Sequence, residues 1–159
     1  MASDYLPLYI KVGESGAYSD SMSYEEAFCT KEAFGLWNQH APFVIAPKIK
    51  TPITQTWLDE DGDDVYLSPS GVKHESYDLT YSFAYIENDG MANVKISQFI
   101  KRIRGKWLKI YDCYTNTCRK GVYLEEIGEP KRYKRRGNQE VFEIELKFKC
   151  NFPDFDETF

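Results

Sequence analysis

The sequence lacks any apolar segment long enough to cross a bilayer. Its longest uncharged apolar stretch, Ala41–Pro47, is interrupted by proline and falls far short of the roughly 18 residues that a spanning helix needs. No basic cluster precedes an apolar segment near the N-terminus, so we expect no secretory signal and folding in a reducing cytoplasm. In that compartment the four cysteines are predicted to be free thiols.

The short motifs of common catalytic sites are also missing. There is no nucleophile elbow, no phosphate-cradling glycine loop and no dinucleotide fingerprint. The run that starts at His74-Glu75 resembles a zinc-protease signature, but Asp78 stands where the second histidine is required. We therefore predict no enzyme, no catalytic residue, no metal and no cofactor.

The cysteines do not form a metal-binding pattern. Cys113 and Cys118 have no second pair of ligands at comparable spacing, which a structural zinc site would need. Cys29 and His40 could form a catalytic pair only if the fold brought them together, and no motif indicates that it does. Whether Cys113 and Cys118 ever pair stays open.

What the sequence does contain is typical of one soluble domain with β structure. The 159 residues are 42% hydrophobic and 28% charged, which favours a single domain over residues 1–159. A net charge of -5 disfavours general binding to nucleic acid, because the protein would repel phosphates. The aromatic fraction of 16% is typical of β-sheets and of association surfaces.

Alternation of apolar and polar residues predicts at least five strands. Tyr77–Ile86 and Val141–Cys150 alternate strictly, as half-buried strands do. Leu6–Val12 alternates near the start of the chain. Trp107–Tyr114 and Gly121–Ile127 are predicted to form a hairpin across Thr115–Lys120.

One substantial helix is predicted over Asn93–Arg104. Ile96, Phe99, Ile100 and Ile103 have helical spacing, and Gly105 follows where a helix would stop. A shorter helix is expected to begin at Ser23, because Ser23 and Glu26 match a capping box. Residues Asn38–Pro52 hold three prolines and are predicted to form an extended connection. The predicted fold class is therefore mainly β (α+β), with one flanking α-helix.

Two short segments are densely charged, one with acidic and one with basic residues. The acidic segment contains Asp59, Glu60, Asp61, Asp63 and Asp64. Its spacing does not match a calcium loop, because Asp64 stands where the turn glycine belongs and Ser70 where the bidentate Glu should be. This favours a solvated acidic loop and leaves open whether the loop binds a cation.

The basic segment contains Lys131, Arg132, Lys134, Arg135 and Arg136. The sequence allows three interpretations of it: a solvated hairpin tip, a contact with nucleic-acid phosphates, or a docking site for an acidic surface. The acidic segment carries five negative charges and the basic segment five positive charges, so we predict that they meet between subunits.

The run Trp57–Tyr66, the aromatic strand to Tyr85, the helix, Ile110–Tyr114 and the ending Phe148–Asp154 resemble small tail proteins of bacteriophages and prophages of gut bacteria. The resemblance covers about two-thirds of the chain, Lys48 to Asp154. Tail-tube, tail-terminator and distal-tail proteins share a β-sandwich or split barrel with one flanking helix, and they form rings stacked along the tail axis. The resemblance does not specify which tail component, ring size or host applies here.

The resemblance implies a structural subunit of a tail that assembles into rings by homotypic contacts. Its expected partners are copies of itself and other phage tail proteins, without membrane or sequence-specific nucleic acid. Its expected location is the virion, after assembly in the cytoplasm of the host bacterium. The alternative function is a ligand-binding β-sandwich of carbohydrate type, in which exposed Trp37, Trp57 and Trp107 would stack on sugar rings.

Overall fold

The protein is described here by a computed structural model. The structure describes residues 7–40, 48–67, 69, 74–87, 89–113, 116–134 and 140–151. The elements in chain order are β1 (Leu8–Val12), β2 (Phe28–Cys29), α1 (Thr30–Phe34), β3 (Leu36–His40), β4 (Ile53–Thr56), β5 (Asp63–Tyr66), β6 (Tyr77–Tyr85), α2 (Ala92–Ile103), β7 (Leu108–Asp112), β8 (Thr117–Ile127), β9 (Lys131–Lys134) and β10 (Glu140–Cys150). The predicted mainly β fold with one substantial helix is confirmed.

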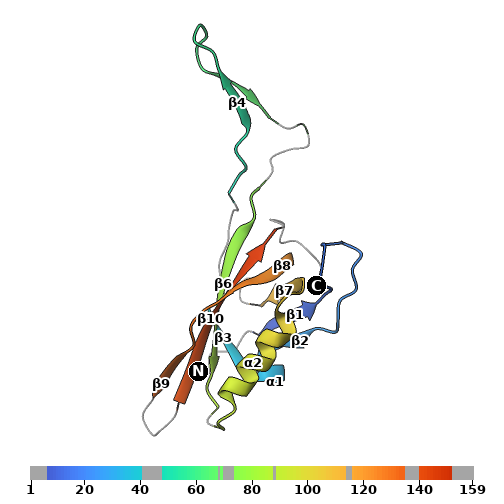
Figure 1. The fold of residues 1–159 in the computed structure, drawn as a ribbon, viewed down its shortest axis with the longest axis vertical. Helices are drawn as coiled ribbons and strands as arrows, with labels where there is room; N and C mark the ends of the chain where they lie inside the picture. Colours follow the sequence, from blue (N-terminus) through green and yellow to red (C-terminus); the bar gives the residue numbers. More distant parts are fainter. Residues whose placement is uncertain are drawn as a thin grey trace.

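Eight of the strands form one antiparallel sheet that curls into a half-barrel (Figure 1). The strand order is β2-β1-β7-β8-β10-β6-β3, and β9 pairs with β10. The two edge strands, β2 and β3, are joined in sequence by the five-residue helix α1. Because one short helix connects both edges, the curled sheet encloses a core on its concave side, as the split-barrel prediction requires.

The core lies between the sheet and α2. The inward faces of β6 and β10 pair in register as Phe83 with Ile144, Tyr81 with Leu146, and Leu79 with Phe148. The outward positions between them are charged or polar, such as Lys147 opposite Thr80. This alternation follows the two-residue period of a strand, so the sequence pattern places the apolar set on one face.

Helix α2 covers the concave face with one apolar stripe. Ala92, Ile96, Phe99 and Ile103 are buried at spacings of three and four residues. The Phe99 ring lies against the rings of Phe34 and Phe83, with centroids 5.4 Å away in each case, and that of Phe28 at 6.5 Å. The predicted boundaries, Asn93 to Arg104, differ from the observed ones by one residue at each end.

Several predicted elements are wrong in detail. Residues 22–27 contain no helix, and the short helix lies instead at Thr30–Phe34. The hairpin turn between β7 and β8 is shorter than predicted, because β8 begins at Thr117 rather than Gly121. The expected extended connection from Asn38 begins inside strand β3. Leu6, Ala41–Pro47, Tyr114 and Thr115 lie outside the described residues.

Strands β4 and β5 form a separate two-stranded hairpin, which Figure 1 shows projecting away from the sheet beyond the start of β6. Within the described residues, no helix has the length and apolar character that crossing a membrane requires.

Candidate functional site

The projecting hairpin is held together by pairing within itself. Its register runs from Ile53 opposite Tyr66 to Thr56 opposite Asp63. The Thr56 hydroxyl donates a hydrogen bond to Asp63 Oδ1 (2.7 Å), and Trp57 Nε1 donates one to Asp64 Oδ2 (2.9 Å). Every residue of β4 and β5 is exposed, so neither face of the hairpin packs on the sheet.

Large apolar side chains are nevertheless concentrated on this hairpin. The exposed ones are Ile53, Trp57, Leu58, Val65, Tyr66 and Leu67. Leu58 is fully exposed, at 106% of its reference area. Soluble monomers rarely present many such residues together, and contiguous exposed apolar surface marks a site of contact with another molecule.

The acidic segment lies at the tip of the same hairpin. Asp59, Glu60 and Asp61 occupy the turn, which confirms the predicted loop for these residues. Asp63 and Asp64 belong to β5 and accept the two hydrogen bonds described above. Among the residues that the structure describes, no group of three or more His, Cys, Asp or Glu side chains is placed to hold a metal ion.

The basic segment is not simply a loop, and this part of the prediction is wrong. Residues 131–134 form strand β9, which pairs with the first part of β10. Arg132 lies opposite Phe142, and its guanidinium carbon is 5.9 Å from the centre of that ring. Lys131 lines a depression together with Glu129, Glu143 and Glu145. Arg135 and Arg136 lie outside the described residues.

The structure does not bring the two charged segments together within one chain. Figure 1 shows β4 and β9 at opposite ends of the molecule. The contact predicted between Asp59, Glu60, Asp61, Asp63, Asp64 and the basic residues would therefore join different subunits. This contact between subunits stays a prediction.

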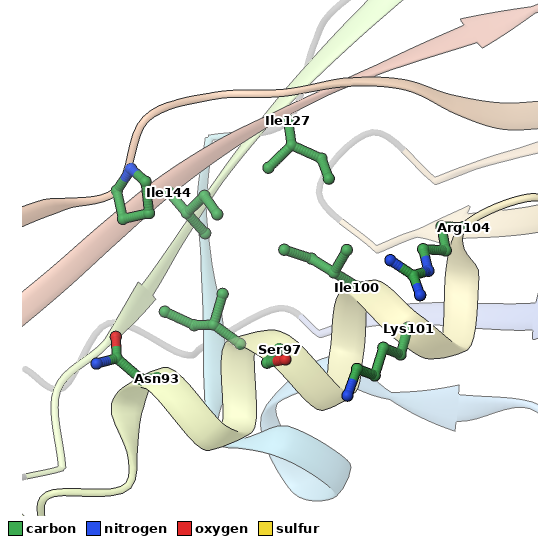
Figure 2. Close-up of a pocket in the computed structure, with 9 residues that line it drawn as sticks. Asn93, Ser97, Ile100, Lys101, Arg104, Ile127 and Ile144 are labelled. Atoms are coloured by element: carbon green, nitrogen blue, oxygen red, sulfur yellow. The ribbon is translucent and has the colours of Figure 1, made fainter.

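A groove that sequence patterns did not indicate lies between α2 and the end of β8 (Figure 2). Its volume is about 220 Å³. It is lined by Asn93, Ile96, Ser97, Ile100, Lys101, Arg104, Ile127, Pro130 and Ile144. In Figure 2, Ile100 and Ile127 face one another across the groove, while Lys101 and Arg104 lie toward the C-terminal end of the helix.

The groove combines an apolar floor with a basic rim. Ile96 and Ile144 are nearly fully buried beneath it, whereas Ile127 is 48% exposed. Lys101 and Arg104 are exposed, and Pro130 leads directly into the basic strand β9. Residues from α2, β8 and β10 meet here, so only the folded sheet creates this surface.

The three tryptophans do not form one sugar-binding platform. Trp107 packs edge-on against Tyr18 and Tyr123, with ring centroids 5.4 and 5.5 Å away. The Lys31 ammonium lies 3.8 Å from the centre of the Trp37 ring. Trp57 lies on the separate hairpin. Contacts within the chain account for Trp107 and Trp37, whereas Trp57 belongs to the exposed apolar side chains of the hairpin.

One buried polar cluster lies inside the sheet and has a structural explanation. Arg119 is 1% exposed, and its Nη1 donates a hydrogen bond to the Tyr81 hydroxyl at 3.3 Å. Burial raises the pKa of Tyr81, and the charge of Arg119 partly opposes that rise. The charge of Asp112, which is also buried, adds to the rise in the pKa of Tyr81. The Tyr81 hydroxyl thus gives the buried Arg119 guanidinium a hydrogen-bond acceptor inside the core.

The cysteines of this structure are free thiols. Burial raises the pKa of the Cys113 thiol, which keeps it in the less reactive protonated form. Cys29, Cys118 and Cys150 are buried, Cys150 at an inward strand position. The side chain of His40, the suggested partner of Cys29, lies outside the described part of the chain.

No protein-family model matches the chain, and no curated protein matches its sequence. Among solved structures, the chain is similar to SPP1 Dit, a hub protein of the adsorption apparatus in phages that infect Gram-positive bacteria. The TM-score is 0.53 at 11% identity, over 91% of this chain and 50% of that one. This chain thus spans half the length of SPP1 Dit, and the two share a fold.

A second similar structure is the tail of a gene transfer agent particle, solved with C6 symmetry. Its TM-score is 0.37 at 12% identity, over 94% of this chain and 96% of that one.

Proposed function

We propose that this chain is a structural subunit of a phage or prophage tail, which assembles into a ring through contacts between copies. The observation that carries the proposal is the projecting hairpin, whose large apolar side chains are exposed and whose strands β4 and β5 form a sheet separate from the main one. Apolar area is stabilised when another chain removes it from water. The fold shared with SPP1 Dit supports the assignment to a tail.

The remaining features of this function follow from the same reasoning. The subunit acts mechanically, without a catalytic site or cofactor, and other tail proteins contact its ring. It resides in the virion after assembly in the cytoplasm of a host bacterium, for which a gut bacterium is the proposed source. Each ring contact repeats because every copy carries both the hairpin and the surface that receives it.

Charge complementarity between the two segments gives the contact its direction. The hairpin tip presents Asp59, Glu60 and Asp61 to solvent, and β9 presents Arg132 on the face that also carries Phe142. A single exposed ion pair contributes only about 0 to 1 kcal/mol, whereas several closing together steer association and fix its register. Lys131 contributes less than Arg132, because three glutamates of its own subunit lie around the same depression.

Charge reversal in two separate proteins tests the proposed ring. The basic variant changes Arg132, Lys134, Arg135 and Arg136 to Glu, and the acidic variant changes Asp59, Glu60, Asp61 and Asp63 to Lys. We expect each variant to fold and remain monomeric by light scattering, and a mixture of the two to associate at low salt. Wild-type protein that stays monomeric at every concentration and salt tried would contradict the proposal and favour the ligand-binding alternative.

A further inference from the structure

The groove beside α2 has the dimensions of a side-chain receptor rather than of a ligand pocket. Small-molecule sites occupy roughly 300 to 1,000 Å³, and this groove holds about 220 Å³. Its floor consists of Ile96, Ile100 and Ile144, and no acidic residue lines it. One aliphatic side chain would match the apolar floor, and acidic residues next to it in the sequence would match the basic rim.

The hairpin tip carries a side chain of this kind. Leu58 is fully exposed and is followed directly by Asp59, Glu60 and Asp61. With Leu58 in the groove, these three carboxylates would face the positively charged Lys101 and Arg104, which lie on the groove rim near the end of α2 (Figure 2). The apolar and the charged parts of the tip therefore complement the groove in the same arrangement.

We propose that Leu58 of one subunit inserts into the groove between α2 and β8 of a second copy of this chain, with the acidic tip against Lys101 and Arg104. This inference rests on the proposed ring and specifies its contact. Pro130 joins the groove to β9, so the groove and the basic strand form one receiving surface.

The occupant is a second copy because the hairpin of the same chain cannot reach the groove. Figure 1 shows the hairpin directed away from the end of the sheet, whereas α2 lies along the body of the domain. A contact of this kind uses two different patches on each subunit, so it is head-to-tail and generates a closed ring when the rotation between copies permits closure.

Blocking the groove gives the first test. Ser97→Trp places a bulky side chain in the groove from an exposed helix position, so the fold is expected to persist. Gln98→Trp is the matched control, because Gln98 is exposed on the same helix outside the groove. We expect Ser97→Trp, like Leu58→Ser, to weaken self-association roughly tenfold to a hundredfold. Gln98→Trp should associate as the wild type does, as measured by analytical ultracentrifugation.

Cross-linking gives the second test. A Leu58→Cys protein is mixed with a Ser97→Cys protein under mild oxidation, and joined peptides are identified by mass spectrometry. In the control mixture, a Thr80→Cys protein replaces the Ser97→Cys protein, because Thr80 is exposed on the outward face of β6. We expect a disulfide between the two introduced thiols in the first mixture and none in the control.

The outcomes separate this inference from the ring on which it rests. If the wild type associates but Ser97→Trp associates equally well and no joined peptide forms, the docking of Leu58 is wrong and the ring stands. Protein that remains monomeric at every concentration overturns both. A joined peptide together with impaired association of Ser97→Trp supports both.

Discussion

Phe99 and Leu58 show how differently two regions of this molecule use large apolar side chains. Phe99 on α2 is 0% exposed and is surrounded by three phenylalanine rings. Leu58 at the hairpin tip is fully exposed. Burial of Phe99 stabilises the domain, whereas Leu58 contributes nothing to the stability of the single chain. The difference separates residues that maintain the fold from residues available for association.

The same division appears in the charged groups. Within the sheet, buried Arg119 contacts Tyr81, and its surroundings are closed to solvent. At the hairpin, the carboxylates of the acidic segment are exposed. Charges of the second kind interact weakly within a subunit and become effective when several meet an oppositely charged surface. Substitutions in the two regions should therefore change different measured quantities.

The largest expected effect on stability comes from truncating Phe99, and the same truncation of Leu58 is its comparison. Phe99→Ala leaves a cavity among aromatic rings and should lower the free energy of unfolding by about 3 to 5 kcal/mol. Leu58→Ala should change it by less than about 0.5 kcal/mol, because no packing is lost. Urea denaturation of dilute protein, followed by circular dichroism, measures both. Equal losses in the two variants would show that the hairpin packs on the domain.

This comparison also explains which elements could be predicted from the sequence. Strands β6 and β10 were predictable because one face of each is buried, so apolar residues recur at every second position. Helix α2 was predictable for the corresponding reason at helical spacing. The hairpin strands β4 and β5 were not, because neither face is buried and no alternation results.

The remaining misses have two physical causes. Strand β9 consists largely of basic residues, but backbone pairing with β10 outweighs their weak strand preference. The capping box at Ser23 has no apolar stripe following it, so packing does not support a helix there. The acidic tip could be located from sequence, whereas the groove could not, because distant segments form it.

Two glycines provide a smaller effect that sharpens the comparison. Gly35 (φ +68°) ends α1, and a Cβ there would lie 2.9 Å from Cε2 of Tyr85. Gly62 (φ +84°) is at the hairpin turn, where nothing lies within 4 Å of a Cβ. Gly35→Ala should cost about 2 kcal/mol or more, because left-handed strain and a steric clash add.

Gly62→Ala introduces the same strain without the clash. Because β4 and β5 form a separate, exposed sheet, we expect the strain to appear as faster amide hydrogen exchange of these two strands rather than as lower global stability. Differential scanning calorimetry and hydrogen exchange distinguish the two outcomes. A comparable fall in the melting temperature of both variants would contradict independent behaviour of the hairpin.

The smallest effect concerns two hydrogen bonds from aromatic side chains to aspartates. In the domain, the buried Tyr85 hydroxyl donates to Asp89, with 2.8 Å to each carboxylate oxygen. In the hairpin, Trp57 donates to Asp64. Tyr85→Phe should lower the free energy of unfolding by about 1 kcal/mol. Trp57→Phe should leave it unchanged within error, because an exposed hydrogen bond exchanges with water.

The pH dependence of the Tyr85→Phe effect follows from two shifts. The backbone N–H of Met91 and the Tyr85 hydroxyl lower the pKa of Asp89, so its contribution to stability is present above the ordinary aspartate range and is lost as the pH falls through the folded value. Burial and the neighbouring Asp89 raise the pKa of Tyr85 to about 12. The contribution of the Tyr85 hydroxyl to stability is therefore present below the unfolded pKa near 10 and is lost as the pH rises through the folded pKa. The stability difference between wild type and Tyr85→Phe should therefore be largest between these limits and narrow at both ends. Urea titrations at a series of pH values measure it, and a constant difference would show that the Tyr85 hydroxyl does not act through Asp89.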